Sequence, residues 1–238
     1  MEHNEKIVLI TGTSRGLGHI IAEHFLAKGD TVIGFSKSDY SFNNPKYHHF
    51  TVDIGDPHSI VTTFKKLATK FSKIDIVINN AAVLTSQYSL IMPIKNAVDM
   101  VNVNLLGTFF VSREAAKLMR KSTAGRIINI GSMAASLEPM GDSVYAATKV
   151  AIQTLANVMA KEFASMKVTC NTIGISAIDT DMLRSHTPTA QEKIEGIIKG
   201  LPVPRKAEAA DVLNVIDFFA SEKSSYITSQ TIYLGGIH

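Results

Sequence analysis

Residues 6–26 read KIVLITGTSRGLGHIIAEHFL, and this stretch decides the fold. Its first six residues form a short, β-branched apolar run that predicts a buried strand. A glycine-rich turn follows at Gly12, Gly16 and Gly18, and an apolar pattern with helical spacing continues to Leu26. A strand, a glycine turn and a helix are typical of a dinucleotide-binding unit, in which a pyrophosphate lies at the positive helix N-terminus. A tight turn without a ligand is the alternative interpretation.

Strand and helix patterns alternate along the rest of the chain. The predicted strands are 6–11, 31–36, 47–53, 74–79, 125–132, 168–173 and 231–234. Helices are predicted after the glycine turn, at 57–71 with Asp56 as N-cap, and at 96–121, 145–165, 191–199 and 208–220. The polar remainder of residues 179–201 is predicted to be a mobile loop. The alternation predicts a single-domain, Rossmann-like α/β fold, a doubly wound parallel sheet of about seven strands with helices on both faces.

Composition excludes several classes of protein. The chain has 238 residues, 45% of them hydrophobic, and a net charge of +3 without a basic cluster, which argues against nucleic-acid binding. One cysteine, Cys170, leaves no internal disulfide framework, and the eight histidines show no metal-ligand spacing. No apolar run is long enough for a bilayer, and the N-terminus does not resemble a signal peptide, so we expect no membrane association and a cytoplasmic location. One domain is expected, with a cofactor half at about 1–125 and a catalytic and substrate half at about 126–238.

Tyr145 and Lys149 are four residues apart in a predicted helix, so their side chains share one face. A tyrosine titrates near 10, and a fixed cation beside it favours the phenolate and lowers that pKa towards the working range. The pair is a candidate proton-transfer device. Such a pair also occurs by chance in many helices, so the evidence for a catalytic role depends on motifs in the rest of the chain.

The end of the second strand bears on the choice of cofactor. A dinucleotide site often places an acid there for the ribose 2′-hydroxyl. This chain has Ser36 and Lys37 at that place and Arg15 in the glycine turn, which favours a 2′-phosphate and hence NADP(H). Asp39 is close enough to keep NAD(H) as the alternative. A further alternative is that Arg15 and Lys37 are ordinary surface residues in contact with water.

Six motifs together resemble the short-chain dehydrogenase/reductase family. They are Thr11-Gly12-x-x-x-Gly16-x-Gly18, Asp53, Asn79-Asn80-Ala81, Asn104, Ser132 and Tyr145-x-x-x-Lys149. Within that family the chain is similar to bacterial 3-oxoacyl-acyl-carrier-protein reductases, through those motifs and through residues 125–128, 180–182 and 226–228.

The resemblance implies a role for each matching residue. Tyr145 would protonate the carbonyl oxygen during hydride delivery, Lys149 would lower its pKa and hold the nicotinamide ribose, and Ser132 would orient the carbonyl. Asn104 would hold a water that links Lys149 to solvent. The implied cofactor contacts are Gly12, Ser14, Arg15, Gly16, Leu17, Gly18, Ser36, Lys37, Asp53, Ile54, Asn80, Ala81, Tyr145, Lys149, Ile178 and Thr180.

The implied activity is NADPH-dependent reduction of a carbonyl to a secondary alcohol. The substrate would be a 3-oxoacyl thioester, with an acyl carrier protein as partner, or alternatively a small ketone, a sugar-derived compound or a secondary-metabolite intermediate. A homotetramer or dimer is implied, since the family packs its helices near 100–121 and 145–165 between subunits. A regulatory or scaffold protein that binds the dinucleotide is the alternative from another class.

The chain departs from the family pattern at four places. Ala82 replaces a glycine, and Ile175-Ser176 replaces a Pro-Gly turn beside the nicotinamide. Thr123 and Met166 stand where the carrier-protein reductases have basic residues near the mouth of the active site. The usual asparagine before the final glycines is missing. These changes weaken the acyl-carrier interpretation and leave the chemistry intact.

Overall fold

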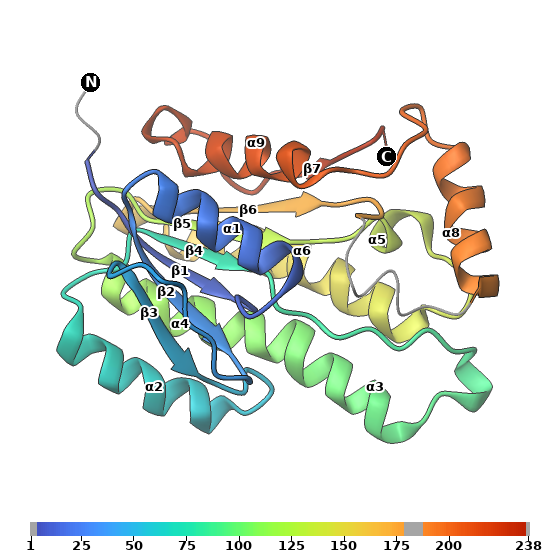
Figure 1. Cartoon of the computed structure of the whole chain (residues 1–238), viewed down its shortest axis with the longest axis horizontal. Helices are drawn as coiled ribbons and strands as arrows, with labels where there is room; N and C mark the ends of the chain where they lie inside the picture. Colours follow the sequence, from blue (N-terminus) through green and yellow to red (C-terminus); the bar gives the residue numbers. More distant parts are fainter. Residues whose placement is uncertain (1–3, 179–187, 237–238) are drawn as a thin grey trace.

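Parallel strands form the centre of the protein (Figure 1) in a computed structural model that describes residues 4–178 and 188–236. The sheet has seven strands in the order β3-β2-β1-β4-β5-β6-β7. Their bounds are β1 Ile7–Thr11, β2 Thr31–Ser36, β3 Tyr47–Thr51, β4 Ile76–Asn79, β5 Arg126–Ile130, β6 Thr169–Gly174 and β7 Thr231–Tyr233. Every pairing is parallel. This arrangement confirms the predicted single-domain Rossmann-like class.

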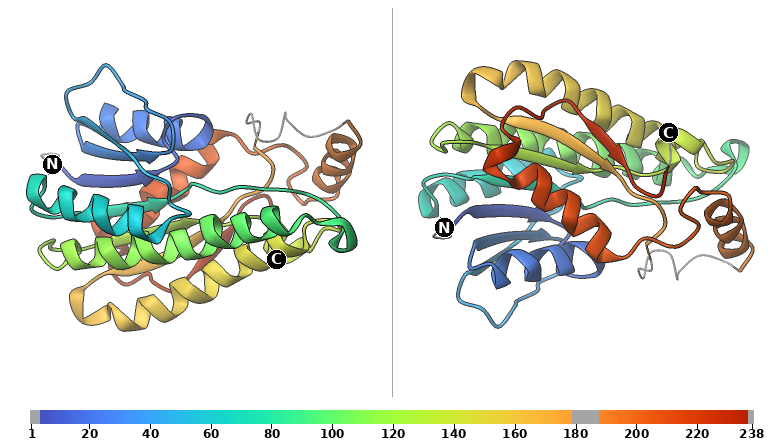
Figure 2. Two further views of the ribbon diagram at one scale, coloured as in Figure 1. Left: turned by 90° about the horizontal axis from the view of Figure 1, so that it is seen from below. Right: turned by 90° about the horizontal axis from the view of Figure 1, so that it is seen from above.

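Helices cover both faces of the sheet, as Figure 2 shows. On one face α1 (Gly16–Ala27) packs on β1 and β2, and α9 (Ala209–Ala220) packs on β5 and β6, around one buried cluster. On the other face α2 (Pro57–Lys70), α4 (Thr108–Met119) and α6 (Ser143–Glu162) enclose a second buried cluster. Because both faces are buried, the central strands β1 and β4 are almost continuously apolar.

The order of the strands creates a crevice at the site. From β1 the chain builds outward to β3, and then crosses back to place β4 on the other side of β1. Loops from β1 and β4 therefore diverge at the carboxyl edge of the sheet, and ligands of such sheets bind at this point. The glycine turn follows β1, and Asn80 follows β4.

The predicted helix at 96–121 is interrupted, so that prediction was wrong in detail. The structure has α3 (Ile94–Met100), a π-helical segment η2 (Val101–Gly107) and then α4. A Cβ atom on Gly107 would lie 2.6 Å from the Ile54 carbonyl oxygen, so the glycine permits close approach to the loop after β3. The π-helical segment contains Asn104, and such segments often occur at functional sites.

The other predicted helices are present with small shifts. Asp56 caps α2 as predicted, since its Oδ1 accepts a hydrogen bond of 2.9 Å from the His58 amide. Helix α8 spans Pro188–Lys199 and begins earlier than predicted, whereas α5 (Ala134–Leu137) was not predicted. Short 3-10 turns lie at Ser89–Ile91, Ala164–Met166 and Glu222–Ser224. The loop predicted before α8 lies largely outside the described residues.

Two neighbouring phenylalanines of α9 test this packing. Phe219 is fully buried against the sheet, whereas Phe218 is 45% exposed. We expect Phe219→Ala to lower the free energy of unfolding by about 3–5 kcal/mol, because it leaves a cavity in the core. Phe218→Ala should change it by less than about 1 kcal/mol. Urea unfolding of both variants checks this, and equal losses would contradict the assignment of the core.

Candidate active site

A cavity of about 1080 Å³ opens at the carboxyl edge of the sheet. Its walls come from the glycine turn, the segments that follow β2, β3, β4, β5 and β6, the N-terminal turn of α6 and one face of α8. The lining side chains include Gly12, Ser14, Arg15, Gly16, Leu17, Ser36, Lys37, Asp39, Ile54, Asn80, Ala81, Ser132, Asp142, Tyr145, Lys149, Ile175, Ile178, Ile194 and Ile197. Most of the residues expected from the sequence therefore meet in one cavity.

The glycine turn has the geometry that a pyrophosphate site needs. Gly12 and Gly16 have positive φ angles of 79° and 57°, and a Cβ on Gly18 would lie 2.1 Å from the Gly12 carbonyl oxygen. Helix α1 begins at Gly16, and the Arg15 side chain makes no capping hydrogen bond. The first amide groups of the helix thus have no side-chain cap, and its positive end suits a phosphate. The turn fits the dinucleotide expected there.

Charged side chains gather after β2. Lys37 lines the cavity, and its Nζ lies 2.9 Å from Oδ2 of Asp53. Asp53 also accepts a hydrogen bond of 2.8 Å from the Gly55 amide. Among the described residues that line the cavity, Ile54 is present and Asp53 is not, so Asp53 holds the loop after β3 and neutralises Lys37. Asp39, also on the cavity wall, is almost fully exposed.

A polar chain behind this end of the cavity was not predicted. The Thr13 and Tyr47 hydroxyl groups are 2.8 Å apart, and the Tyr47 hydroxyl lies 3.2 Å from Nδ1 of His49. Nε2 of His49 lies 4.0 Å from Oδ1 of Asp39. The signal in the sequence was the spacing of Tyr47 and His49, since residues two apart on a strand share a face. This row of polar contacts joins the glycine turn to the segment after β2.

Asn80 ties β4 to the glycine turn. Its side-chain Nδ2 donates to the Thr11 carbonyl oxygen at 2.9 Å, and its amide donates to the Thr11 hydroxyl at 3.0 Å. The Ala81 amide donates to the same hydroxyl. The Asn80 side chain therefore joins the segment after β4 to the end of β1 at the place where it lines the cavity. Ala82, the first departure from the family pattern, also lies on the wall.

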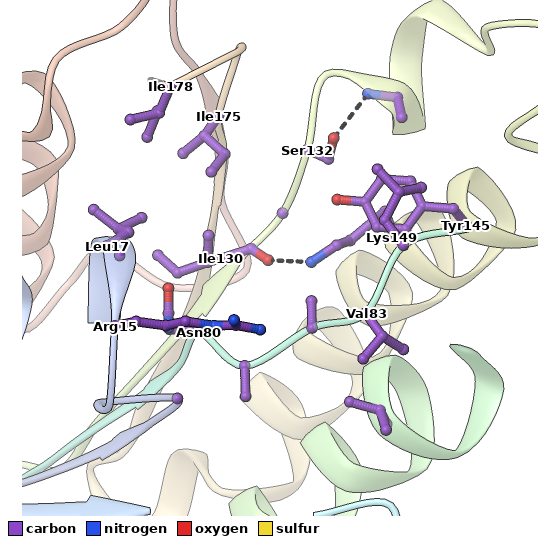
Figure 3. A pocket seen from close by; sticks show the side chains of 18 of the residues that line it. Arg15, Leu17, Asn80, Val83, Ile130, Ser132, Tyr145, Lys149, Ile175 and Ile178 are labelled. Atoms are coloured by element: carbon purple, nitrogen blue, oxygen red, sulfur yellow. Dashed lines mark hydrogen bonds between the residues drawn. The ribbon is translucent and has the colours of Figure 1, made fainter. Parts of the chain in front are cut away.

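Ser132, Tyr145 and Lys149 lie on one wall of the cavity, across from Leu17 and Ile178 (Figure 3). Helix α6 places Tyr145 and Lys149 one turn apart on the same face. The Lys149 Nζ donates a hydrogen bond of 2.8 Å to the Ile130 carbonyl oxygen and lies 5.6 Å from the centre of the Tyr145 ring. Ser132 follows β5, and its Oγ accepts a hydrogen bond of 3.1 Å from the Ala134 amide. The three residues are therefore held by backbone groups of β5, α5 and α6.

Burial controls the protonation of this wall. It raises the pKa of Tyr145 to about 12. The hydrogen bond with Ser132 lowers this pKa, and the Asp142 charge raises it further, but burial is the largest effect. Burial also lowers the pKa of Lys149 to about 8. The expected lowering of the Tyr145 pKa by Lys149 was therefore wrong for this arrangement, because burial disfavours the charged form of both groups. At neutral pH Tyr145 is a protonated phenol and Lys149 is mostly an ammonium.

Asn104 lies behind the wall and is buried. Its Oδ1 accepts from the Val83 amide at 2.9 Å, and its Nδ2 donates to the Val83 carbonyl oxygen at 2.9 Å and to the Thr148 hydroxyl at 3.2 Å. Thr148 precedes Lys149 in α6. Asn104 thus joins the loop after β4 to the helix that contains Tyr145 and Lys149, and among the described residues it is not part of the cavity wall.

The segment after β6 closes the cavity despite its changed sequence. The Met133 amide donates to the Ile175 carbonyl oxygen at 2.7 Å, and Ile178 bridges to Ala207. Ile194 and Ile197 of α8, which were not predicted as site residues, reach the wall; their spacing of three along a helix was the available signal. Thr180 and the Asp181-Met182 stretch lie outside the described residues.

One expected feature lies elsewhere. Thr123 and Met166 precede β5 and β6, at the amino edge of the sheet, and the cavity is at the carboxyl edge. Within one chain these positions therefore do not border the mouth of the cavity. The Met166 sulfur instead accepts a hydrogen bond from Nε of Arg120 at 3.4 Å.

In residues 4–178 and 188–236 no helix could span a bilayer, and no His, Cys, Asp or Glu cluster could hold a metal ion.

Comparison with known proteins agrees with this geometry. The family model for short chain dehydrogenases matches residues 6–191. The 3-oxoacyl-[acyl-carrier-protein] reductase of Escherichia coli K12 is 32% identical, over 99% of this chain and 98% of that protein. The protein of the same name from Haemophilus influenzae is also 32% identical, over 97% of each chain.

Solved structures give the same result. The aldohexose dehydrogenase of Thermoplasma acidophilum has a TM-score of 0.88 and 28% identity, covering 98% of this chain and 94% of that one. A putative gluconate dehydrogenase from Agrobacterium tumefaciens has a TM-score of 0.88 and 25% identity, covering 99% and 96%. The chain therefore belongs to the short-chain dehydrogenase/reductase family and is an NAD(P)-dependent oxidoreductase.

Proposed function

We propose that this protein reduces a ketone to a secondary alcohol with NADPH as the reductant. One observation carries the proposal: Ser132, Tyr145 and Lys149 share a wall of the cavity whose other end is the glycine turn. A dinucleotide with its pyrophosphate at α1 would extend towards that wall. When bound, the nicotinamide supplies the hydride, and the protein supplies the proton and the alignment.

The proton comes from Tyr145. Its hydroxyl is protonated at neutral pH, as an acid that donates to a carbonyl oxygen must be, and in the reverse reaction it accepts the proton. As negative charge develops on the carbonyl oxygen, the Ser132 hydroxyl donates a hydrogen bond to it and the Lys149 ammonium stabilises it electrostatically. We assign to Lys149 the ribose hydroxyls of the nicotinamide nucleotide. Asn104 would position Lys149 through Thr148 and hold the water that returns its proton.

The preference for NADPH rests on the cations near the 2′ position. Arg15 and Lys37 both line the cavity, and Ser36 adds a hydroxyl group. Asp39 is the acid nearest to them in sequence, and it points into solvent. Two cations against one exposed acid favour a 2′-phosphate, provided that the phosphate competes with Asp53 for Lys37.

The relatives support a 3-oxoacyl thioester as substrate and an acyl carrier protein as partner. Ile175-Ser176, which replaces the family's Pro-Gly turn, lines the cavity, and this change supports a small or sugar-derived ketone as the second candidate. A purely regulatory or scaffold role is disfavoured, because such a protein has no need to keep Asn104, Ser132, Tyr145 and Lys149 together.

Exposed apolar side chains support assembly into a homodimer or homotetramer. They are Val98, Val101 and Leu106 near α4, and Val150 and Val158 of α6.

Replacement of Tyr145 tests the proton donor. Tyr145→Phe should lower kcat by two or more orders of magnitude, because a positioned acid contributes about 10²–10⁴-fold, and should leave the cofactor Kd nearly unchanged. NADPH oxidation with a panel of ketones and thioesters and fluorescence titration of NADPH measure the two effects. Tyr226→Phe, at a fully exposed tyrosine, is the matched control. Retained turnover in Tyr145→Phe would remove Tyr145 from this role.

A charge reversal at Lys37 tests the cofactor preference. Lys37→Asp should raise the ratio of the NADPH Kd to the NADH Kd by at least about tenfold, since it replaces attraction of the 2′-phosphate by repulsion. Lys65→Asp makes the same charge change on the exposed side of α2 and should leave the ratio unchanged. An unaltered ratio in Lys37→Asp would show that Lys37 does not contact the phosphate.

The buried Lys149 should be visible in the pH dependence of stability. Its pKa is about 8 in the folded chain against 10.5 ordinarily, so between these values the unfolded chain binds the extra proton and stability rises with pH. From pH 7.5 to 9.5 the free energy of unfolding of the wild type should rise by about 2 kcal/mol relative to Lys149→Met. Urea unfolding at both pH values measures this. A constant difference between the two proteins would mean that Lys149 is not buried as an amine.

A further inference from the structure

Asp142 belongs to the cavity wall, and neither the proton transfer nor the proposed cofactor site uses it. It is the N-cap residue of α6 and precedes Tyr145 by three positions, so both side chains lie on the same side of the first turn. The Asp142 charge also raises the pKa of Tyr145. Because both residues line the same cavity, Asp142 borders the place where a substrate carbonyl would lie.

The backbone around Asp142 is fixed. Its amide donates to the Pro139 carbonyl oxygen at 3.1 Å, and its carbonyl oxygen accepts from the Ala146 amide at 2.7 Å. The preceding residue, Gly141, accepts from the Gln87 amide at 2.8 Å, which joins this turn to the loop after β4. The carboxylate is thus presented from a rigid segment.

One oxygen of the Asp142 carboxylate lacks a partner among the described residues. Its Oδ1 is buried and, within the part of the chain that the structure describes, accepts no hydrogen bond. The side chain does not cap α6. A carboxylate that is partly removed from water without a donor costs free energy, and a donor from a ligand would recover part of it.

The other charged side chains of the cavity do not pair with the Asp142 carboxylate. In the described ranges the charged lining residues are Arg15, Lys37, Asp39, Asp142 and Lys149. The first three line the end beside the glycine turn and β2, and Lys149 is bound to the Ile130 carbonyl oxygen. Asp142 is therefore the one acid at the catalytic end among these residues, and much of the wall around it is apolar, including Met133, Pro139 and Ile175.

We propose that Asp142 is a specificity-determining residue that selects ketones with a hydroxyl group on the carbon next to the carbonyl. This inference rests on the proposed function. With the carbonyl oxygen at Tyr145 and Ser132, the neighbouring hydroxyl donates to the Asp142 carboxylate. A 3-oxoacyl thioester has two carbonyl groups and a methylene near the reacting carbon, and none of these is a hydrogen-bond donor. Its second carbonyl oxygen would face a carboxylate, which is unfavourable.

The size of the effect follows from the unpaired group. A site built to hydrogen-bond a substrate hydroxyl can reject the analogue that lacks it by about 10⁴–10⁵, because its own polar group is left unpaired. Asp142 is only partly buried, so we expect at least about 100-fold discrimination.

The test compares paired substrates in the full-length protein with NADPH. The substrates are 3-hydroxybutan-2-one, butan-2-one and the acetoacetyl thioester of N-acetylcysteamine, and the proteins are wild type, Asp142→Ala and the exposed-site control Asp99→Ala. For the wild type and the control we expect kcat/KM to be at least about 100-fold higher for the hydroxyketone than for the other two. Asp142→Ala should reduce this ratio about 30-fold or more, mainly through the hydroxyketone. The ratio is unaffected by any general change in the acidity of Tyr145, since that acts on all three substrates.

Two kinds of result would overturn the inference, and they distinguish an error about Asp142 from an error about the proposed function. If the wild type reduces the thioester as well as the hydroxyketone, or if Asp142→Ala changes all substrates equally, the role of Asp142 is wrong and the reductase stands. If NADPH binds to the wild type and no carbonyl compound is reduced, the proposed function fails and the inference falls with it. An unchanged NADPH Kd and an unchanged circular dichroism spectrum in Asp142→Ala show that the variant is folded.

Discussion

The hydrogen bond of 2.8 Å from the Lys149 ammonium to the Ile130 carbonyl oxygen joins the last residue of β5 to α6. It holds a buried cation beside Tyr145, where a free ammonium would otherwise turn to solvent. Because Ser132 follows Ile130 by two residues, the same contact fixes the distance between the strand end and the helix. The arrangement of the catalytic wall depends on this bond, and the lowered pKa of Lys149 reflects the cost of burying the ammonium.

Much of the fold followed from local patterns in the sequence. The glycine turn, the seven strands and the spacing of Tyr145 and Lys149 depend on residues near one another in the chain, so periodicity and turn chemistry predict them. The π-helical segment did not follow, and it ends at Gly107, which lies close to Ile54, a contact between residues distant in the sequence. The ion pair of Asp53 with Lys37 did not follow for the same reason, since it exists only once β2 and β3 are adjacent. The Tyr145 pKa was misjudged because a sequence shows a neighbouring charge and hides the burial that outweighs it.

The two ends of the cavity have opposite electrostatic character. The end beside the glycine turn has two cations and the positive terminus of α1, and its acids are either paired, as Asp53 is, or exposed, as Asp39 is. Among the described residues, the catalytic end has one ammonium, which is bound to a carbonyl group, and Asp142, whose buried Oδ1 accepts no hydrogen bond. A phosphate-rich cofactor and a neutral substrate with a hydrogen-bond donor suit this polarity. A substrate with acceptors alone suits the catalytic end less well.

Family membership and substrate are decided by different parts of this molecule. In the proposed reaction, the motifs that place the chain among short-chain dehydrogenases would hold the cofactor and move the proton, needs that such carbonyl reductions share. Substrate selection would depend on the segments beyond the strand ends, namely residues 133–142, Ile175-Ser176 and α8, and Ile175-Ser176 departs from the family pattern. An identity of 32% to carrier-protein reductases therefore constrains the first group of residues more than the second. The acid beside Tyr145 belongs to the second group, and it is there that the chemistry of the substrate must be sought.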